Sequence, residues 1–225
     1  MAADSLLPWE NIDTVLVDMD GTLLDLAFDN FFWLDLVPSA YAARHALDET
    51  EARRQVLSRY EIARCEIAAG SLAWYSVEHW TQELGLDIRA LKSRHKHLIN
   101  YLPGARRFLA AVRALGKPVF VVTNAHPDTL AIKTAQTQLN LHVDKIFCSH
   151  DFAAPKESAD FWVRFARAQP FDAERSLLIE DSLAVLGAAE RHGLRYTVAI
   201  RRPDSRAPER RVESFRAVAG VADLL

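Results

Sequence analysis

The chain has 225 residues, of which 50% are hydrophobic and 25% are charged, a composition typical of a globular protein. The formal net charge of −3 gives no broad basic surface, so we expect no nucleic-acid polymer as a partner. No apolar run approaches the roughly 18 residues of a membrane span, and residues 1–10 lack the pattern of a signal peptide. Cys65 and Cys148 lack metal-ligand spacing, so we expect a cytoplasmic protein without a membrane contact.

Apolar runs predict the strands of one sheet. The first run covers residues 14–17, and later runs cover 119–122, 145–148, 176–179 and 196–200. Helical patterns lie between these later runs, and the first helix is expected to begin at Pro103 and to end before Gly116. This alternation favours an α/β fold with a doubly wound parallel sheet that helices cover on both faces.

The segment 26–99 has a different pattern, with helical spacing, few strand signals and many aromatic residues. We expect an all-helical domain there, inserted into a core formed by residues 1–25 and 100–225. Trp74, Tyr75 and Trp80 either stack on a flat substrate base or pack the interior of this insert, and packing is the commoner use.

Polar residues follow four of the predicted strands. In open α/β sheets, ligands bind outside the carboxyl ends of the strands, so we expect these side chains to converge on one edge. Two carboxylates two residues apart are costly at the end of a buried strand unless they are paired or bind a metal. The residues are Asp18 and Asp20, Thr123 and Asn124, Lys156, and Glu180 and Asp181.

These residues resemble the haloacid dehalogenase-like superfamily of phosphohydrolases. Residues 18–22 (Asp-Met-Asp-Gly-Thr) look like its first motif, Thr123 its second, Lys156 its third, and Glu180 with Asp181 its fourth. The helical segment lies where one subgroup carries an inserted cap domain. The resemblance implies a phosphohydrolase with a helical cap that opens for substrate and closes to exclude water.

Elementary chemistry agrees with this resemblance. An ionised Asp18 can attack phosphorus and form an aspartyl-phosphate, while Asp20 acts as general acid and then as general base. Thr123, Asn124 and Lys156 are the expected phosphate-binding residues, and Lys156 also offsets negative charge. An oxygen-rich ligand set suits Mg²⁺. The expected ligands are the carboxylates of Asp18 and Asp181, Glu180 directly or through water, and, as the resemblance implies, the backbone carbonyl of Asp20.

Longer strings give a finer resemblance. Residues 18–33, 123–127, 155–157 and 203–205 look like the bacterial GMP/IMP 5′-nucleotidase group of the superfamily. The resemblance implies a purine nucleoside 5′-monophosphate as the small phosphorylated substrate. Glu180 stands where many relatives carry Asp, although a carboxylate is retained.

Other functions remain open at this point. The same core serves phosphatases or phosphomutases of other small metabolites, such as phosphoglycolate or a sugar phosphate. A 2-haloacid dehalogenase needs neither a metal nor a second acid, so Asp20, Glu180 and Asp181 argue against it. The intact acids also argue against a non-catalytic binding protein.

The histidines and a stretch of arginines are the remaining polar residues whose locations we predict. His126 is a candidate for lining the site, whereas His95 and His97 are expected on a solvated helix face. The arginines between positions 201 and 211 are expected on a solvated surface, because acidic residues are interspersed among them.

Overall fold

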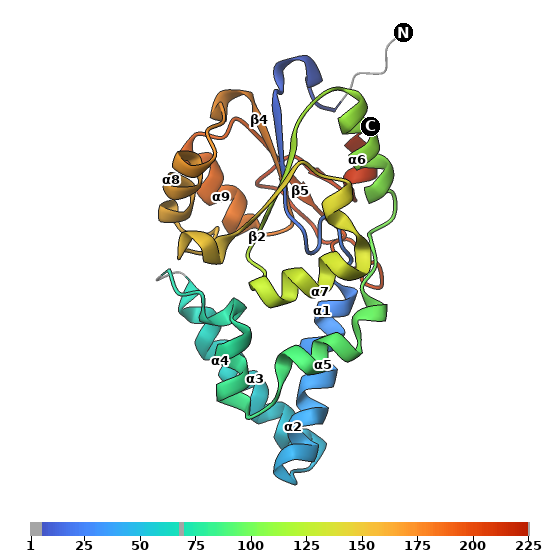
Figure 1. Cartoon of the computed structure of the whole chain (residues 1–225), viewed down its shortest axis with the longest axis vertical. Helices are drawn as coiled ribbons and strands as arrows, with labels where there is room; N and C mark the ends of the chain where they lie inside the picture. Colours follow the sequence, from blue (N-terminus) through green and yellow to red (C-terminus); the bar gives the residue numbers. More distant parts are fainter. Residues whose placement is uncertain (1–5, 68–69, 225) are drawn as a thin grey trace.

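The computed structural model describes residues 6–67 and 70–224. A sheet with helices on both faces forms one end of the molecule, and the helices of the inserted segment form the other end (Figure 1). Among the described residues, no helix combines the length and the hydropathy that a membrane span requires. Residues 1–5, on which the expectation about a signal peptide partly rests, lie outside the described residues.

Within the described residues, the sheet has six parallel strands in the order β3-β2-β1-β4-β5-β6. All five predicted strands are confirmed to within one residue at their ends, and the doubly wound parallel sheet is therefore confirmed. The sixth strand was not predicted, because two residues are too few to give a periodic pattern. The strands are β1 (Thr14–Val17), β2 (Val119–Thr123), β3 (Lys145–Cys148), β4 (Ser176–Glu180), β5 (Tyr196–Ile200) and β6 (Ala217–Val218).

Successive residues of the central strands face opposite sides of the sheet. Val15 and Val17 belong to the hydrophobic cluster that contains residues of α6, whereas Leu16 belongs to the cluster that contains residues of α8 and α9. These helices lie on opposite sides of the sheet in Figure 1. Burial on both faces explains why the strands read as continuous apolar runs. The core helices are α6 (Ala105–Ala114), α7 (Pro127–Thr137), α8 (Ala159–Ala168) and α9 (Leu183–His192).

The predicted start of α6 was wrong by two residues. Pro103 lies before the helix, and Gly104 is the N-cap residue with a φ of 79°. The predicted end was correct, because Gly116 follows the helix with a φ of 71°. A residue with positive φ interrupts the helical path, and glycine adopts that conformation readily.

Helices alone make up the regular structure of the inserted segment among its described residues. Trp80 is 1% exposed, its ring lies 4.8 Å from that of Tyr60, and its Nε1–H donates to the carbonyl of Trp74. Trp80 therefore packs the interior of the insert. The elements are α1 (Ala27–Phe31), a π-helical turn (Phe32–Leu36), α2 (Val37–His45), α3 (Glu49–Cys65), α4 (Val77–Leu84) and α5 (Ile88–Arg94).

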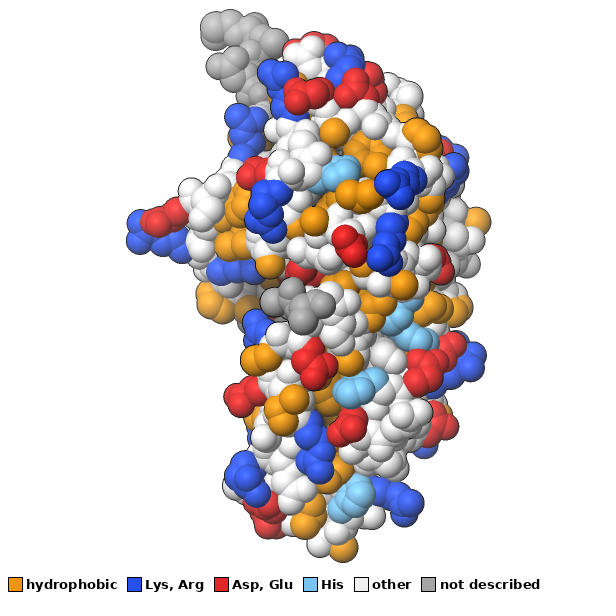
Figure 2. Space-filling view, turned by 90° about the vertical axis from the view of Figure 1, so that its left-hand side faces the viewer, with side chains coloured by type: hydrophobic (Ala, Val, Ile, Leu, Met, Phe, Trp, Pro, Cys, Tyr) orange, Lys and Arg blue, Asp and Glu red, His pale blue; other side chains and the backbone are white. Residues whose placement is uncertain are grey.

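The surface charges are mixed on the face that Figure 2 shows. Lysine and arginine side chains lie among aspartate and glutamate side chains over both ends of the molecule, without a continuous basic region on that face. This distribution agrees with the small net charge of −3.

Candidate active site

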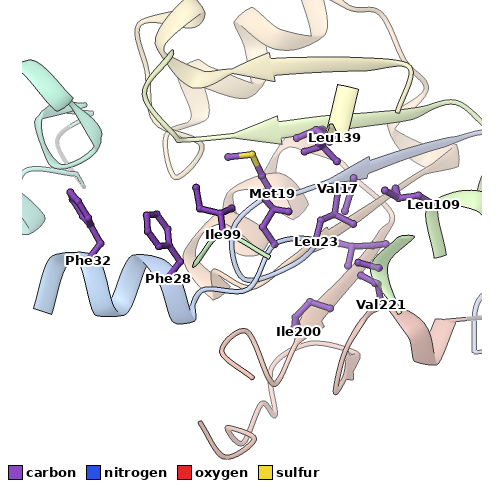
Figure 3. Packing of buried hydrophobic residues seen from close by; sticks show 14 of the residues in the cluster. Val17, Met19, Leu23, Phe28, Phe32, Ile99, Leu109, Leu139, Ile200 and Val221 are labelled. Carbon is purple, nitrogen blue, oxygen red and sulfur yellow. The ribbon is translucent and has the colours of Figure 1, made fainter. Parts of the chain in front are cut away.

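Asp18 follows β1 directly and is fixed by backbone contacts. Its N–H donates to the carbonyl of Ile179 in β4 at 2.9 Å, and the residue is only 5% exposed. The next residue, Met19, is buried, and its side chain lies in the hydrophobic cluster near Leu23 and Ile99 (Figure 3). The hydrophobic core therefore anchors the loop between the two candidate acids.

The turn after Asp20 requires glycine at position 21 for two reasons. Gly21 has a φ of 81°, which a residue with a side chain adopts only with strain. A Cβ at this position would also lie 2.8 Å from Cγ of Asp181 and 2.9 Å from Cβ of Pro203. The turn closes through a 2.7 Å hydrogen bond from the Gly21 N–H to the carbonyl of Leu24.

Three carboxylates meet at the carboxyl end of the sheet. Carboxylate oxygens of Asp18, Glu180 and Asp181 lie within 4.8 Å of one another. The parallel pairing of β1 with β4 produces this arrangement, because Asp18 follows β1 while Glu180 ends β4. All donors are hard oxygens, so the set has the chemistry that Mg²⁺ prefers.

Lys156 is the cation within this cluster. Its Nζ donates to a carboxylate oxygen of Asp18, to Oε2 of Glu180 at 2.6 Å and to the carbonyl of Val122 at 2.8 Å. The three ammonium protons are thereby used, and the residue is 1% exposed. One lysine does not balance three carboxylates, so the buried cluster keeps an excess of negative charge.

The pKa values of the three carboxyls are raised, chiefly by burial. Burial raises the pKa of Asp18 to about 8, with Glu180 adding to the effect and Lys156 opposing it. Burial likewise raises the pKa of Glu180 to about 7 and that of Asp181 to about 6, and a neighbouring carboxylate contributes in each case. A divalent cation would favour the ionised forms, so the cluster fits such an ion on electrostatic grounds as well as by its donors.

Thr123 ends β2 beside this cluster, Asn124 follows it, and both are buried. The Thr123 hydroxyl accepts a hydrogen bond from the Ala125 N–H at 3.0 Å. The Asn124 side chain accepts from the Lys156 N–H and donates to Glu157, each at 2.9 Å. The amide of Asn124, an expected phosphate-binding residue, joins the β2 loop to the loop that carries Lys156.

Asp20 lies in a separate ion pair. Its Oδ1 accepts from Nζ of Lys133 in α7 at 2.6 Å, and Lys133 also contacts Asp29. The Asp20 carboxylate is therefore engaged outside the group formed by Asp18, Glu180 and Asp181. Burial raises the pKa of Asp20, and the ammonium of Lys133 partly offsets that rise.

Sequence reasoning missed Lys133 and Asp29. A lysine in an amphipathic helix normally lies on the solvated face, whereas Lys133 is 1% exposed. The sequence does contain one indication that Lys133 is buried. Lys133 lies three residues after Leu130, so it shares the helix face that packs against the hydrophobic core.

The expectation that the arginines between positions 201 and 211 lie on a solvated surface is wrong for Arg210. The residue is half-buried, and its guanidinium donates to the backbone carbonyls of Asp181 and Ile200. It therefore supports the backbone of a candidate metal ligand. Arg211 meets the expectation, because its side chain is 88% exposed and pairs with Glu213.

His126 lies where the insert meets the core. His126 caps α7 by accepting from the Asp128 N–H, and its Nε2 lies 2.6 Å from Glu78 of α4. These three residues form a second group of potential ligands, but Asp128 also pairs with Arg89 at 3.6 Å. We interpret the group as a polar contact between the insert and the core.

Known proteins with related sequences and folds were compared with this chain. GMP/IMP nucleotidase YrfG of Escherichia coli (strain K12) is 39% identical over 207 residues, which cover 92% of this chain and 91% of the relative. A HAD phosphatase from Thermococcus onnurineus has a TM-score of 0.77 at 21% identity, covering 95% of this chain and 96% of that one. An L-2-haloacid dehalogenase from Xanthobacter autotrophicus has a TM-score of 0.64 at 16% identity, with the same coverage.

The two solved structures agree in fold while their names differ in activity, so they bear on the fold alone. The haloacid dehalogenase-like hydrolase family matches residues 12–193, which include all four predicted motifs. The family match and the 39% identity to a nucleotidase agree with each other. The chain belongs to the haloacid dehalogenase-like hydrolases.

Proposed function

We propose that this protein is a Mg²⁺-dependent phosphomonoester hydrolase whose substrates are the purine nucleoside 5′-monophosphates GMP and IMP. The identity of 39% with a GMP/IMP nucleotidase over 92% of the chain supports the substrate. The observation that carries the reaction is the contact of Asp18 with Lys156 inside the cluster completed by Glu180 and Asp181.

Asp18 is the proposed nucleophile. Its carboxylate attacks phosphorus and forms an aspartyl-phosphate, which splits one difficult displacement into two easier ones. Asp20 is the proposed proton carrier: it protonates the leaving oxygen in the first step and accepts a proton from the attacking water in the second. The burial that raises the pKa of Asp20 favours the protonated form that the first step needs.

The remaining residues bind and neutralise charge. Thr123 and neighbouring backbone N–H groups hold phosphate oxygens, and the ammonium of Lys156 offsets charge on Asp18 and the phosphoryl group. Asp18, Asp181 and Glu180, with the backbone carbonyl of Asp20, would hold Mg²⁺. The ion would supply positive charge to the carboxylate cluster and polarise a phosphoryl oxygen.

The retained acids favour phosphoryl transfer over dehalogenation. A dehalogenase that attacks carbon with one aspartate needs neither a second acid nor a cation. Glu180 is 1% exposed beside Asp18 and Asp181, and Lys156 offers one positive charge to these three carboxylates, so a further cation would lower the electrostatic cost of burying them.

We propose residues 26–99 as a cap domain over a core of residues 1–25 and 100–225. The insert touches the core beside the site, because Tyr75 donates to Glu157 and Glu78 contacts His126. The cap is therefore the part of the chain in which we expect the purine to be selected. Cys65 and Cys148 are free thiols, which fits the reducing cytoplasm in which we place the protein.

Phosphate release from a substrate panel tests this proposal. The panel contains GMP, IMP, AMP, CMP, phosphoglycolate and a hexose phosphate, each with Mg²⁺ and with EDTA. We expect the highest kcat/KM with GMP and IMP, loss of turnover with EDTA, and recovery when Mg²⁺ is added. Asp18→Asn should abolish release, whereas Asp13→Asn, which alters an exposed acid paired with Arg175, should not.

The outcomes separate the alternatives. Preference for phosphoglycolate or the hexose phosphate would overturn the purine substrate but keep the reaction. An isomeric sugar phosphate formed without phosphate release would indicate a phosphomutase, and chloride released from L-2-chloropropionate would indicate a dehalogenase. Phosphatase activity that survives Asp18→Asn would overturn the mechanism.

A further inference from the structure

Four charged side chains of alternating sign connect the inserted helices to Asp20. Lys92 of α5 contacts Asp29 of α1 at 3.2 Å, Asp29 contacts Lys133 of α7 at 2.5 Å, and Lys133 contacts Asp20 at 2.6 Å. The side chains of Lys92 and Lys133 are 3% and 1% exposed. The elements therefore meet through ion pairs whose lysines are closed to water and whose carboxylates are partly exposed.

At the end of this series of ion pairs that is remote from Asp20, Lys92 packs against aromatic rings of the insert. Nζ of Lys92 lies 4.6 Å from the ring centre of Phe32, 5.2 Å from that of Trp33 and 5.8 Å from that of Phe28. Phe28 and Phe32 project from the same side of their helix (Figure 3). A cation over several ring faces is stabilised there, and Lys92 also pairs with Asp29.

At the other end of this series of ion pairs, Lys133 fixes one carboxylate oxygen of Asp20. Lys133 donates to Oδ1 of Asp20, and its ammonium is shared with Asp29. The backbone of Lys133 is part of α7, and the Thr137 hydroxyl donates to its carbonyl at 2.8 Å. Because Met19 is buried beside Asp20, the backbone and the side chain of Asp20 are restrained from two directions.

We propose that Lys133 and Asp29 are positioning residues that hold Oδ1 of Asp20 so that its carboxyl faces the leaving oxygen of the substrate, with Lys92 fixing Asp29 from the cap. The proposal rests on the proposed function. In the step concerned, an oxygen of Asp18 forms a bond to phosphorus while the bond from phosphorus to the leaving oxygen breaks. The electron pair of that bond stays on the leaving oxygen, which takes the proton of Asp20.

A comparison of two leaving groups isolates this role. The 5′-oxygen of GMP needs a proton as it departs, whereas p-nitrophenolate departs from p-nitrophenyl phosphate without one. Rapid mixing measures the first turnover, as guanosine formed from GMP or as the burst of p-nitrophenol. The first turnover excludes the later hydrolysis step, in which Asp20 acts on both substrates alike.

The variants are Lys133→Met and Asp29→Asn, with Lys145→Met as the control. Lys145 is exposed and contacts Gln169, outside the site. General acid catalysis contributes about 10²–10⁴-fold, so we expect each positioning variant to slow the first turnover of GMP by about tenfold to a hundredfold. The p-nitrophenol burst and the KM for GMP should change less than about threefold, and the control should match wild type.

Equal slowing with both substrates, or no slowing with GMP, would overturn the proposal. Asp29→Asn is nearly isosteric, so it provides the test if Lys133→Met fails to fold. A different result would overturn the proposed function: a wild-type enzyme that releases no phosphate from GMP. If another alkyl phosphate is the better substrate, the same comparison is made with that ester.

Discussion

The phenol of Tyr75 in the insert donates a 2.7 Å hydrogen bond to Oε1 of Glu157 in the core. The other carboxylate oxygen of Glu157 accepts from Asn124, which in turn accepts from the Lys156 N–H. Burial, with Glu157 adding to it, raises the pKa of Tyr75 far above its usual range, so the phenol remains a donor. Hydrogen bonds thus link the insert to the lysine that neutralises Asp18.

Removing this hydroxyl should loosen the contact between the insert and the core. A hydrogen bond to a charged group contributes about 1.5–3 kcal/mol, so Tyr75→Phe should lower the free energy of unfolding by about 1–2 kcal/mol and raise KM. Urea unfolding and steady-state kinetics provide the measurements. Tyr41→Phe is the matched control, because Tyr41 donates to Gln55 within the insert and its loss should leave KM unchanged. Equal KM values for both variants would contradict the prediction.

Gly21→Ala should weaken the response to Mg²⁺. The added Cβ would meet the Asp181 carboxylate at 2.8–2.9 Å and displace a candidate ligand, while the φ of 81° adds strain of about 1–3 kcal/mol. Activity is measured against Mg²⁺ concentration, together with unfolding in urea. Gly116→Ala has the same kind of strain at φ 71° with no neighbour within 4 Å, so it should lose stability and keep its Mg²⁺ response. If Gly21→Ala and Gly116→Ala shift the Mg²⁺ response equally, backbone strain and not the clash with Asp181 causes the shift.

Arg210→Met should also raise the Mg²⁺ concentration needed for half-maximal activity. Arg210 holds the backbone carbonyl of Asp181, and its charge opposes the burial that raises the pKa of that carboxyl. Loss of one charge-assisted hydrogen bond costs about 1.5–3 kcal/mol, so we expect a shift of about tenfold to a hundredfold. Arg211→Met, at an 88% exposed position, is the control and should leave the curve unchanged. An unshifted curve for Arg210→Met would exclude this supporting role.

The metal-free protein should become less stable as pH rises from about 4 to about 8. The folded-state pKa values of Asp18, Glu180 and Asp181 are raised to about 8, 7 and 6, so the folded state holds protons that the unfolded chain has released. Stability falls with pH wherever the folded state binds more protons. Urea unfolding in EDTA at pH 5 and pH 8 measures the fall. Mg²⁺ should reduce it, because the ion favours the ionised carboxylates.

Asp18→Asn provides the control for this pH dependence. The substitution removes the carboxyl whose pKa is raised most among these three, while Lys156 keeps its contact with Glu180. The fall in stability between pH 5 and pH 8 should therefore be smaller than in wild type. A slope unchanged by Asp18→Asn would assign the pH dependence to other groups.

Local sequence was sufficient for most of the fold. Strands β1 to β5 were predictable because each is a short apolar run buried in the sheet, and Gly116 marked the end of α6 through its positive φ. The start of α6 and the two-residue strand β6 were not predictable. For α6, the residue directly before the helix is Gly104 and not Pro103. For β6, two residues are too few to show a periodic pattern.

The sequence by itself determined which acids and which lysine stand at the strand ends, and hence the family and the expected chemistry. Only the tertiary structure decided the partners of the buried charges: Lys133 meets Asp20, which lies 113 positions away, and Arg210 supports Asp181. The reason is that the cost of a buried charge depends on the neighbours that folding brings within a few ångströms. A lysine in a helix and an arginine in a charged stretch look alike in sequence whether they face water or a carboxylate.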